Sequence, residues 1–120
     1  MLLVDDDVAV RRTIARFLMR DGIAVVEADN GLEALTYLRG GGVPAVILLD
    51  LRMPVMDGWA FRQAQRQDPA FGHVPVIVLS GADTHRFDEL DAIAAFEKPV
   101  SLSEILDLVR RLVENPVTPG

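Results

Sequence analysis

The chain has 120 residues without a single cysteine, and it contains no apolar run of the roughly 18 residues that a membrane-spanning helix needs. Without cysteine it forms neither disulfide bonds nor thiolate metal sites, which is compatible with the cytoplasm. No charged segment followed by an apolar stretch and a small-residue cleavage site opens the chain, so no secretory signal is expected. We therefore expect a cytoplasmic protein that does not enter a membrane.

Basic residues and histidines are also scarce. The 12 Lys and Arg residues against 18 Asp and Glu residues give a net charge of −6, which disfavours nucleic-acid binding because phosphate contacts need clustered cations. The pairs Arg11–Arg12 and Arg110–Arg111 are expected to lie on solvated helix surfaces. His73 and His85 are expected in loops that face solvent, without the partners that an acyl-transfer site requires.

The most apolar stretch of the chain precedes an acidic residue. Ala45–Leu49 reads AVILL with no polar face, which is typical of a strand buried on both sides in a parallel sheet. A buried helix would give the same run, but Pro54 and the β-branched Val46 and Ile47 favour a strand. Asp50 follows directly, where a carboxylate is costly unless it faces a cleft or a cation. Taken alone, Asp50 is equally well explained as a helix or turn cap.

Strand and helix patterns alternate along the chain. Strands are predicted over 1–5, 23–28, 45–49, 74–79 and 93–97, and helices over about 10–21, 30–40, 57–68, 84–91 and 101–114. Asp7 is expected to cap the first helix, and two capping-box patterns, Asn30 with Glu33 and Ser101 with Glu104, open the second and fifth. This alternation predicts one α/β domain with a parallel sheet covered by helices on both faces.

Polar residues stand where four of the predicted strands end, and the carboxyl ends of parallel strands meet at one edge of a sheet. Three carboxylates brought together there raise one another's proton affinity unless a cation is present, and their oxygens suit Mg²⁺. A metal, a lysine and a hydroxyl around one carboxylate form a site at which that carboxylate can attack phosphorus. The residues are Asp5 and Asp6 after the first strand, Asp50 after the third, Ser80 after the fourth and Lys98 after the fifth.

The motifs VDDD, DLRMPVMDG, LSGAD and EKP occupy these junctions in this order. Through them the chain resembles the receiver domain of two-component response regulators, a CheY-like family, over residues 1–114. The resemblance implies a doubly wound, flavodoxin-like fold with five helices and five parallel strands in the order 2-1-3-4-5. The remaining residues, 115–120, read NPVTPG and are expected to be a linker or a disordered tail.

The resemblance also implies a role for each junction residue. Asp50 would be the phosphoacceptor, and Lys98 and Ser80 would contact the phosphoryl group. Residues of the DLRMPVMDG motif after the acceptor, Met53, Pro54, Asp57 and Gly58, would shape the loop. Apart from the resemblance, Trp59 is expected to be a helix residue that covers the edge of the core. The implied Mg²⁺ ligands are Asp5, Asp6, Asp50 and the backbone carbonyl of Arg52.

The function implied by the resemblance is a signalling switch that takes a phosphoryl group from a histidine kinase or a phosphotransfer protein. It would need Mg²⁺, would slowly hydrolyse its own phosphoryl group, and would not be an enzyme acting on other substrates. A tethered output domain or a partner protein would read the change, and homodimer formation stays open. One alternative is a degenerate receiver that binds partners without phosphorylation. Another is a Mg²⁺-dependent phosphatase, for which no insertion is long enough to form a cap.

One position departs from the family pattern. Receivers usually carry Tyr or Phe three residues before the lysine, where this chain has Ala95. Phe96 comes one residue later, and the alternation of a strand would direct its ring to the opposite face. The resemblance further implies a cis peptide bond between Lys98 and Pro99. We therefore expect an intact phosphorylation site with an altered route for transmitting its state.

Overall fold

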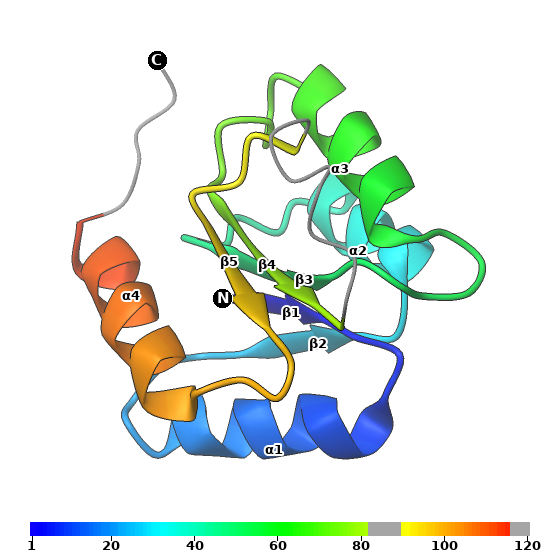
Figure 1. The fold of residues 1–120 in the computed structure, drawn as a ribbon. Coiled ribbons are helices and arrows are strands. Elements are labelled where there is room, and N and C mark those ends of the chain that lie inside the picture. The colour runs from blue at the N-terminus through cyan, green and yellow to red at the C-terminus, as the bar shows by residue number, and fades with distance from the viewer. Residues whose placement is uncertain (82–89, 116–120) are drawn as a thin grey trace.

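A five-stranded parallel sheet forms the centre of the protein (Figure 1). The computed structural model describes residues 1–81 and 90–115. All neighbouring strands run parallel, in the order β2-β1-β3-β4-β5. This confirms the predicted doubly wound sheet and its strand order. The strands are β1 (Leu2–Val4), β2 (Val26–Ala28), β3 (Ile47–Asp50), β4 (Val76–Ser80) and β5 (Ala94–Glu97).

Helices cover both faces of this sheet (Figure 1). Helices α1 (Val8–Met19) and α4 (Leu102–Glu114) lie on one face, and α2 (Gly31–Arg39) and α3 (Gly58–Gln67) lie on the other. Helix α4 is the one predicted over 101–114. The helix predicted over 84–91 falls outside the described residues except for its last two, and residues 116–120 of the predicted tail fall outside them entirely. Within the described ranges, no helix is long and apolar enough to cross a bilayer.

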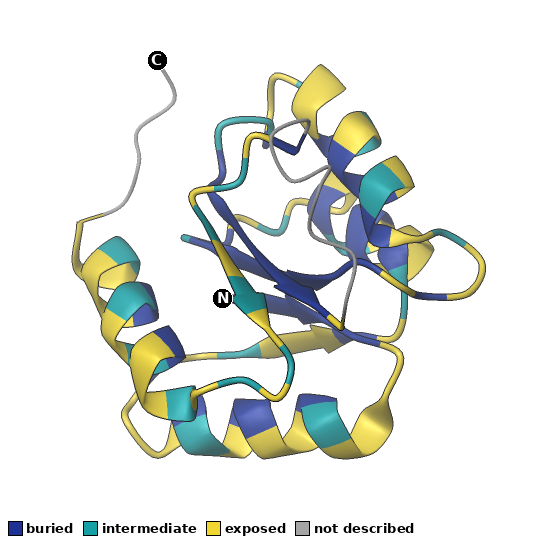
Figure 2. Cartoon of the chain, in the orientation of Figure 1, coloured by how far each residue is buried: buried dark blue, intermediate teal, exposed yellow. Residues whose placement is uncertain are grey.

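The alternation of side chains along each strand divides the core into two layers. In β1, Leu2 and Val4 join the cluster under α2 and α3, whereas Leu3 joins the cluster under α1 and α4. The central strands β1, β3 and β4 are buried on both faces, as their continuous apolar sequence predicted, while β2 and β5 at the two edges are partly exposed (Figure 2). The sheet is therefore a rigid platform whose strand ends can hold a site.

Each of the four described helices begins with a side-chain cap. The Asp7 carboxylate accepts hydrogen bonds from the backbone N–H groups of Ala9 and Val10, at 3.0 and 3.2 Å. The equivalent acceptors for α2, α3 and α4 are Asn30, Asp57 and Ser101. These caps satisfy N–H groups that would otherwise lack partners. They fix the turn from strand to helix at the edge where the strands end.

Strand β2 is shorter than predicted, since it begins at Val26 instead of Ile23. Among the described strands it neighbours only β1, whose three residues pair with Val26, Glu27 and Ala28. The apolar residues before Val26 therefore have no strand to pair with, although Ile23 is buried in the core. The length of an edge strand depends on the length of the strand it pairs with, and the sequence of the edge strand itself carries no information about that partner.

Candidate functional site

Three carboxylates meet at the carboxyl edge of the sheet. Asp5 and Asp6 follow β1, Asp50 ends β3, and one oxygen from each lies within 4.8 Å of the others. Asp5 is 0% exposed and Asp50 is 4% exposed, whereas Asp6 is exposed. Two buried carboxylates this close repel each other strongly. The arrangement confirms that the predicted strand ends converge, and it needs positive charge nearby.

Lys98 supplies one such charge at the end of β5. Its Nζ lies 3.3 Å from Asp5 Oδ2 and 3.3 Å from Asp50 Oδ1. The backbone N–H of Lys98 donates to the carbonyl of Ser80 at 2.8 Å, which holds the end of β5 against the end of β4. The Lys98–Pro99 peptide bond is cis, as predicted. The ammonium thus bridges two of the three carboxylates.

Ser80 and Arg52 complete the predicted set. Ser80 ends β4 and is buried, in register with Glu97 of β5 and one residue beyond Leu79, which pairs with Asp50. Arg52 lies two residues after Asp50, and its backbone amide forms a hydrogen bond with the Asp50 carboxylate. All of the predicted site residues therefore belong to one edge of the sheet. The Arg52 carbonyl as a metal ligand stays a prediction.

Burial shifts the ionisation of this cluster. Burial and, after it, the charge of Asp5 raise the pKa of Asp50 from an ordinary 3.8 to about 6, against the opposing effect of Lys98. Burial disfavours the charged form of Lys98, but the attraction of Asp5 and Asp50 outweighs it and the pKa of Lys98 is raised. At neutral pH the site therefore holds an ionised Asp50 and a protonated Lys98.

The raised pKa of Asp50 predicts a pH-dependent stability for the metal-free protein. The folded state binds the Asp50 proton more tightly than the unfolded state, so this stabilisation is complete below about pH 4 and is lost as pH rises through about 6. A shift of this size corresponds to about 3 kcal/mol. In chelator, the Asp50→Asn variant should gain stability relative to wild type between pH 4 and 7.5 in urea titrations. A constant difference across that range would contradict the prediction.

A cavity of about 470 Å³ opens beside the carboxylates. Asp6 is the carboxylate of the cluster that lines it, and Trp59 forms part of its wall. Trp59 also packs against the core, as predicted. The lining residues are Asp6, Leu51, Arg52, Met53, Pro54, Asp57 and Trp59.

The donor atoms of the cluster fit a magnesium ion. Mg²⁺ prefers carboxylate oxygens at about 2.1 Å, so two of its oxygen ligands lie about 3 to 4 Å apart. The oxygens of Asp5, Asp6 and Asp50 approach this spacing, at 4.8 Å or less. One exposed carboxylate on the cavity side leaves space for water and phosphate oxygens, which Mg²⁺ usually keeps in its shell.

One residue near the site was wrongly predicted to lie on a solvated surface. Arg11 is only 7% exposed. Its guanidinium donates to the backbone carbonyl of Asp5 at 2.8 Å and forms ion pairs with Glu27 and Asp29. The sequence contains a signal for this burial, because Arg11 precedes Ile14, Ala15 and Leu18 at the helical spacing i, i+3, i+4, i+7.

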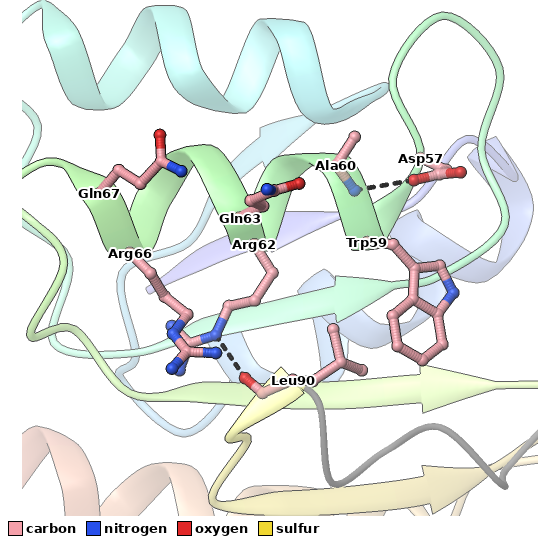
Figure 3. A pocket seen from close by; sticks show the side chains of 8 residues that line it. All are labelled: Asp57, Trp59, Ala60, Arg62, Gln63, Arg66, Gln67 and Leu90. Carbon is pink, nitrogen blue, oxygen red and sulfur yellow. Dashed lines mark hydrogen bonds between the residues drawn. The ribbon is translucent and has the colours of Figure 1, made fainter.

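A second buried arginine lies on the opposite face of the sheet. Arg62 of α3 donates to the carbonyls of Leu90 and Asp91 at 2.8 and 2.9 Å, and to Gln65 Oε1. Gln65 in turn donates to the carbonyls of Phe71 and Val74. The network borders a cavity of about 790 Å³ that Trp59 and Leu90 also line (Figure 3). It anchors α3 to the chain that enters β5, away from the carboxylates.

His73 lies in a loop, as predicted, but it faces solvent only in part. The residue is half-buried in the loop before β4, and its Nδ1 is buried with no hydrogen-bond partner among the described residues. Phe71, two residues before it, and Val74, directly after it, belong to the core, so this loop packs inward where a solvent-facing loop was predicted. His85 falls outside the described residues. The described histidine thus lies away from the carboxylate cluster.

Comparison with known protein families identifies the class of this chain. The family model described as "Response regulator receiver domain" matches residues 1–110. The match covers far more than half of the chain, and with the sheet order and the carboxylate cluster it leads to one conclusion. The chain belongs to the response regulator receiver domain family.

Similar proteins include signalling proteins of several bacteria. The chain is 33% identical over 119 residues to the sensor histidine kinase CheAY of Helicobacter pylori, covering 95% of this chain and 15% of that protein. It is 34% identical to the response regulator Rre1 of Synechocystis, covering 94% of this chain and 51% of Rre1. The chain thus spans about half the length of such response regulators, and less of the kinase.

Solved receiver structures share the fold. The receiver domain of the Francisella response regulator 1452 superposes with a TM-score of 0.84 at 27% identity, covering 94% of each chain. The chemotaxis response regulator CheY4 of Vibrio cholerae superposes with a TM-score of 0.81 at 28% identity, covering 92% of this chain and 95% of CheY4. These similarities support the fold independently of the motifs.

Proposed function

We propose that this receiver domain is a phosphorylation-controlled switch that accepts one phosphoryl group on Asp50. The observation that carries the proposal is the position of Lys98 Nζ, 3.3 Å from both Asp5 and Asp50, at the edge of a three-carboxylate cluster. An ammonium between two buried carboxylates is placed to receive the negative oxygens of a phosphoryl group. Receiver domains are signalling domains, and we expect no other substrate to be turned over.

The transfer step uses the ionised Asp50. Its carboxylate oxygen attacks phosphorus as the bond from phosphorus to the donor breaks. With a phosphohistidine donor, the electron pair of that bond stays on the imidazole nitrogen, and the ring leaves neutral after taking a proton from solvent. Lys98 and Ser80 would bind the transferred phosphoryl oxygens. In slow autodephosphorylation, water attacks phosphorus, the bond to Asp50 breaks, and inorganic phosphate leaves.

Magnesium would be held by Asp5, Asp6 and Asp50 with the backbone carbonyl of Arg52. When bound, Mg²⁺ offsets the charge of the carboxylates and of the phosphoryl oxygens. The ends of β1 and β3 would orient the carboxylates. The cavity beside Trp59 would give the phosphoryl donor access to the site.

The proposed partners follow from the class of the similar proteins. A histidine kinase or a histidine phosphotransfer protein would supply the phosphoryl group. A tethered output domain or a separate partner protein would read the change, since the chain spans only part of the length of its relatives. We propose no direct binding of nucleic acid, since acidic residues outnumber basic ones in the chain.

The proposal is tested by incubating the protein with acetyl phosphate, with and without Mg²⁺, and measuring intact mass. We expect the mass to increase by one phosphoryl group only with Mg²⁺. No increase at any Mg²⁺ concentration would contradict the proposal and favour a receiver that acts without phosphorylation. Turnover of a generic phosphate ester, measured in parallel, would instead indicate a phosphatase.

The small side chain of Ala95 should limit how far phosphorylation changes the structure of β5. Ala95 is exposed on one side of β5, while the Phe96 ring packs on the other side against the cluster of α1 and α4. An alanine has no alternative rotamer with which to follow a movement of Ser80. We expect beryllofluoride, a phosphoryl mimic, to change the backbone amide shifts of Ser80 and Gly81 strongly and those of Ala94–Phe96 little. In Ala95→Tyr the β5 shifts should grow. Large β5 shifts in wild type that the tyrosine leaves unchanged would contradict this.

A further inference from the structure

We propose that Arg11 is a positioning residue for the metal-binding carboxylate of Asp5. The inference rests on the proposed function, because it assigns Arg11 a role in the Mg²⁺ affinity of that same site. Arg11 itself touches no reacting group. It acts on the backbone of Asp5, from beneath the carboxylate cluster.

The contacts of Arg11 join three elements at the end of β1. From α1, its Nη1 donates to the Asp5 carbonyl at 2.8 Å, a hydrogen bond that is buried. Its Nε donates to Glu27 of β2 at 2.9 Å, and Nη1 lies 2.5 Å from an oxygen of Asp29 just after β2. The planar guanidinium thereby ties Asp5 to the neighbouring strand at several points, which a single ammonium cannot reproduce.

The Asp5 carboxylate has little freedom apart from this backbone. Its Oδ1 accepts from the N–H of Asp7 at 3.0 Å, and its Oδ2 receives Lys98 Nζ. The N–H of Asp5 donates to the Ala28 carbonyl at 3.2 Å. A shift of the Asp5 carbonyl would therefore carry the carboxylate with it. Groups that orient metal ligands in this way typically change metal affinity about 10- to 100-fold when they are removed.

The positive charge of Arg11, considered alone, would lower the Mg²⁺ affinity of the site, whereas its positioning of Asp5 would raise it. A cation close to a divalent metal site repels the metal. If Arg11 acted only through its charge, removing it should strengthen Mg²⁺ binding. If Arg11 positions Asp5, removing it should weaken Mg²⁺ binding. The sign of the change therefore separates the two roles, and it also separates positioning from a purely structural role, which would lower stability without changing Mg²⁺ affinity.

The experiment is a Mg²⁺ titration of the full chain, read by the fluorescence of its single tryptophan, Trp59, which lines the cavity with Asp6. The variants are Arg11→Gln and Arg11→Lys. Arg11→Lys keeps the positive charge but loses the planar guanidinium and its several N–H donors. We expect the Kd for Mg²⁺ to rise about 10-fold or more in Arg11→Gln, and to rise less in Arg11→Lys. The rise in melting temperature on adding Mg²⁺ should shrink in the same order.

Two matched controls complete the test. Arg62→Gln removes another buried arginine, 6% exposed and donating to backbone carbonyls, from the opposite face of the sheet. Arg12→Gln removes the same charge from the exposed side of α1. Both should keep the wild-type Kd, although Arg62→Gln should be less stable. If Arg11→Gln does not fold, Arg11→Lys alone decides.

Wild-type affinity or tighter binding in Arg11→Lys and in any folded Arg11→Gln would overturn the inference and leave the proposed function standing. A wild-type protein that binds no Mg²⁺ would overturn the proposed function, and with it the role of Arg11. The two failures are therefore distinguishable in a single titration series.

Discussion

The Asp50→Asn variant is expected to gain no phosphoryl group from acetyl phosphate and Mg²⁺, under conditions in which wild type is fully modified. An amide oxygen lacks the negative charge that makes the carboxylate a nucleophile, and Asn also replaces one of the three carboxylates that would hold the metal with a neutral amide. The change should be close to isosteric, so the burial of residue 50 at the end of β3 should persist. Intact mass is the measurement, with circular dichroism to show that the variant is folded.

Asp57→Asn is the matched control for this prediction. Asp57 lies in the same loop, and its carboxylate accepts from the Ala60 N–H at 2.9 Å as the N-cap of α3. Asparagine caps helices about as well as aspartate, so this variant should fold and should take up a phosphoryl group like wild type. A mass increase that persists in Asp50→Asn would move the acceptor to another carboxylate, such as Asp5 or Asp6, and would contradict the assignment.

The parallel α/β sheet and the convergence of the site were predictable from local patterns, whereas the strand order came only from the family resemblance. The run Ala45–Leu49 has no polar face, and a strand without a polar face must be covered on both sides. Once the sheet is parallel, the residues that end its strands meet at one edge, so Asp50 and Lys98 could be brought together without knowledge of their separation. The distance of 3.3 Å between them depends on packing that no local pattern contains.

The buried arginines mark the limit of that reasoning. Arg11 was assigned to a solvated face and no environment was predicted for Arg62. Yet Arg62 follows Gly58 and Phe61 and precedes Gln65 at the spacing of a buried helical face. Whether a charge at such a position is buried depends on partners elsewhere in the chain, here the carbonyls of Leu90 and Asp91. The helical spacing marks such a position as a candidate for burial, and the tertiary contacts decide whether the charge is in fact buried.

Gly58→Ala is expected to destabilise the fold and to distort the phosphoacceptor at the same time. A Cβ built on Gly58 would lie 2.6 Å from the carbonyl oxygen of Asp50 and 2.7 Å from Cα of Leu51. Both are backbone atoms, so no side chain can rotate to relieve the clash, and either the start of α3 or the end of β3 must move. The N–H of Gly58 also donates to the Leu51 carbonyl at 2.9 Å, and this bond would be strained.

We expect Gly58→Ala to lower the free energy of unfolding by about 3 kcal/mol, toward the upper end of the usual cost of overpacking. Phosphorylation of the folded fraction should also slow, because Asp50 is displaced relative to Lys98. Urea titration and the rate of mass increase are the two measurements. Gly81→Ala is the control, since a Cβ there meets no atom of the described residues within 4 Å and should leave both quantities close to wild type. If Gly58→Ala matched the control in both measurements, the close approach of α3 to the end of β3 would not be required for the site.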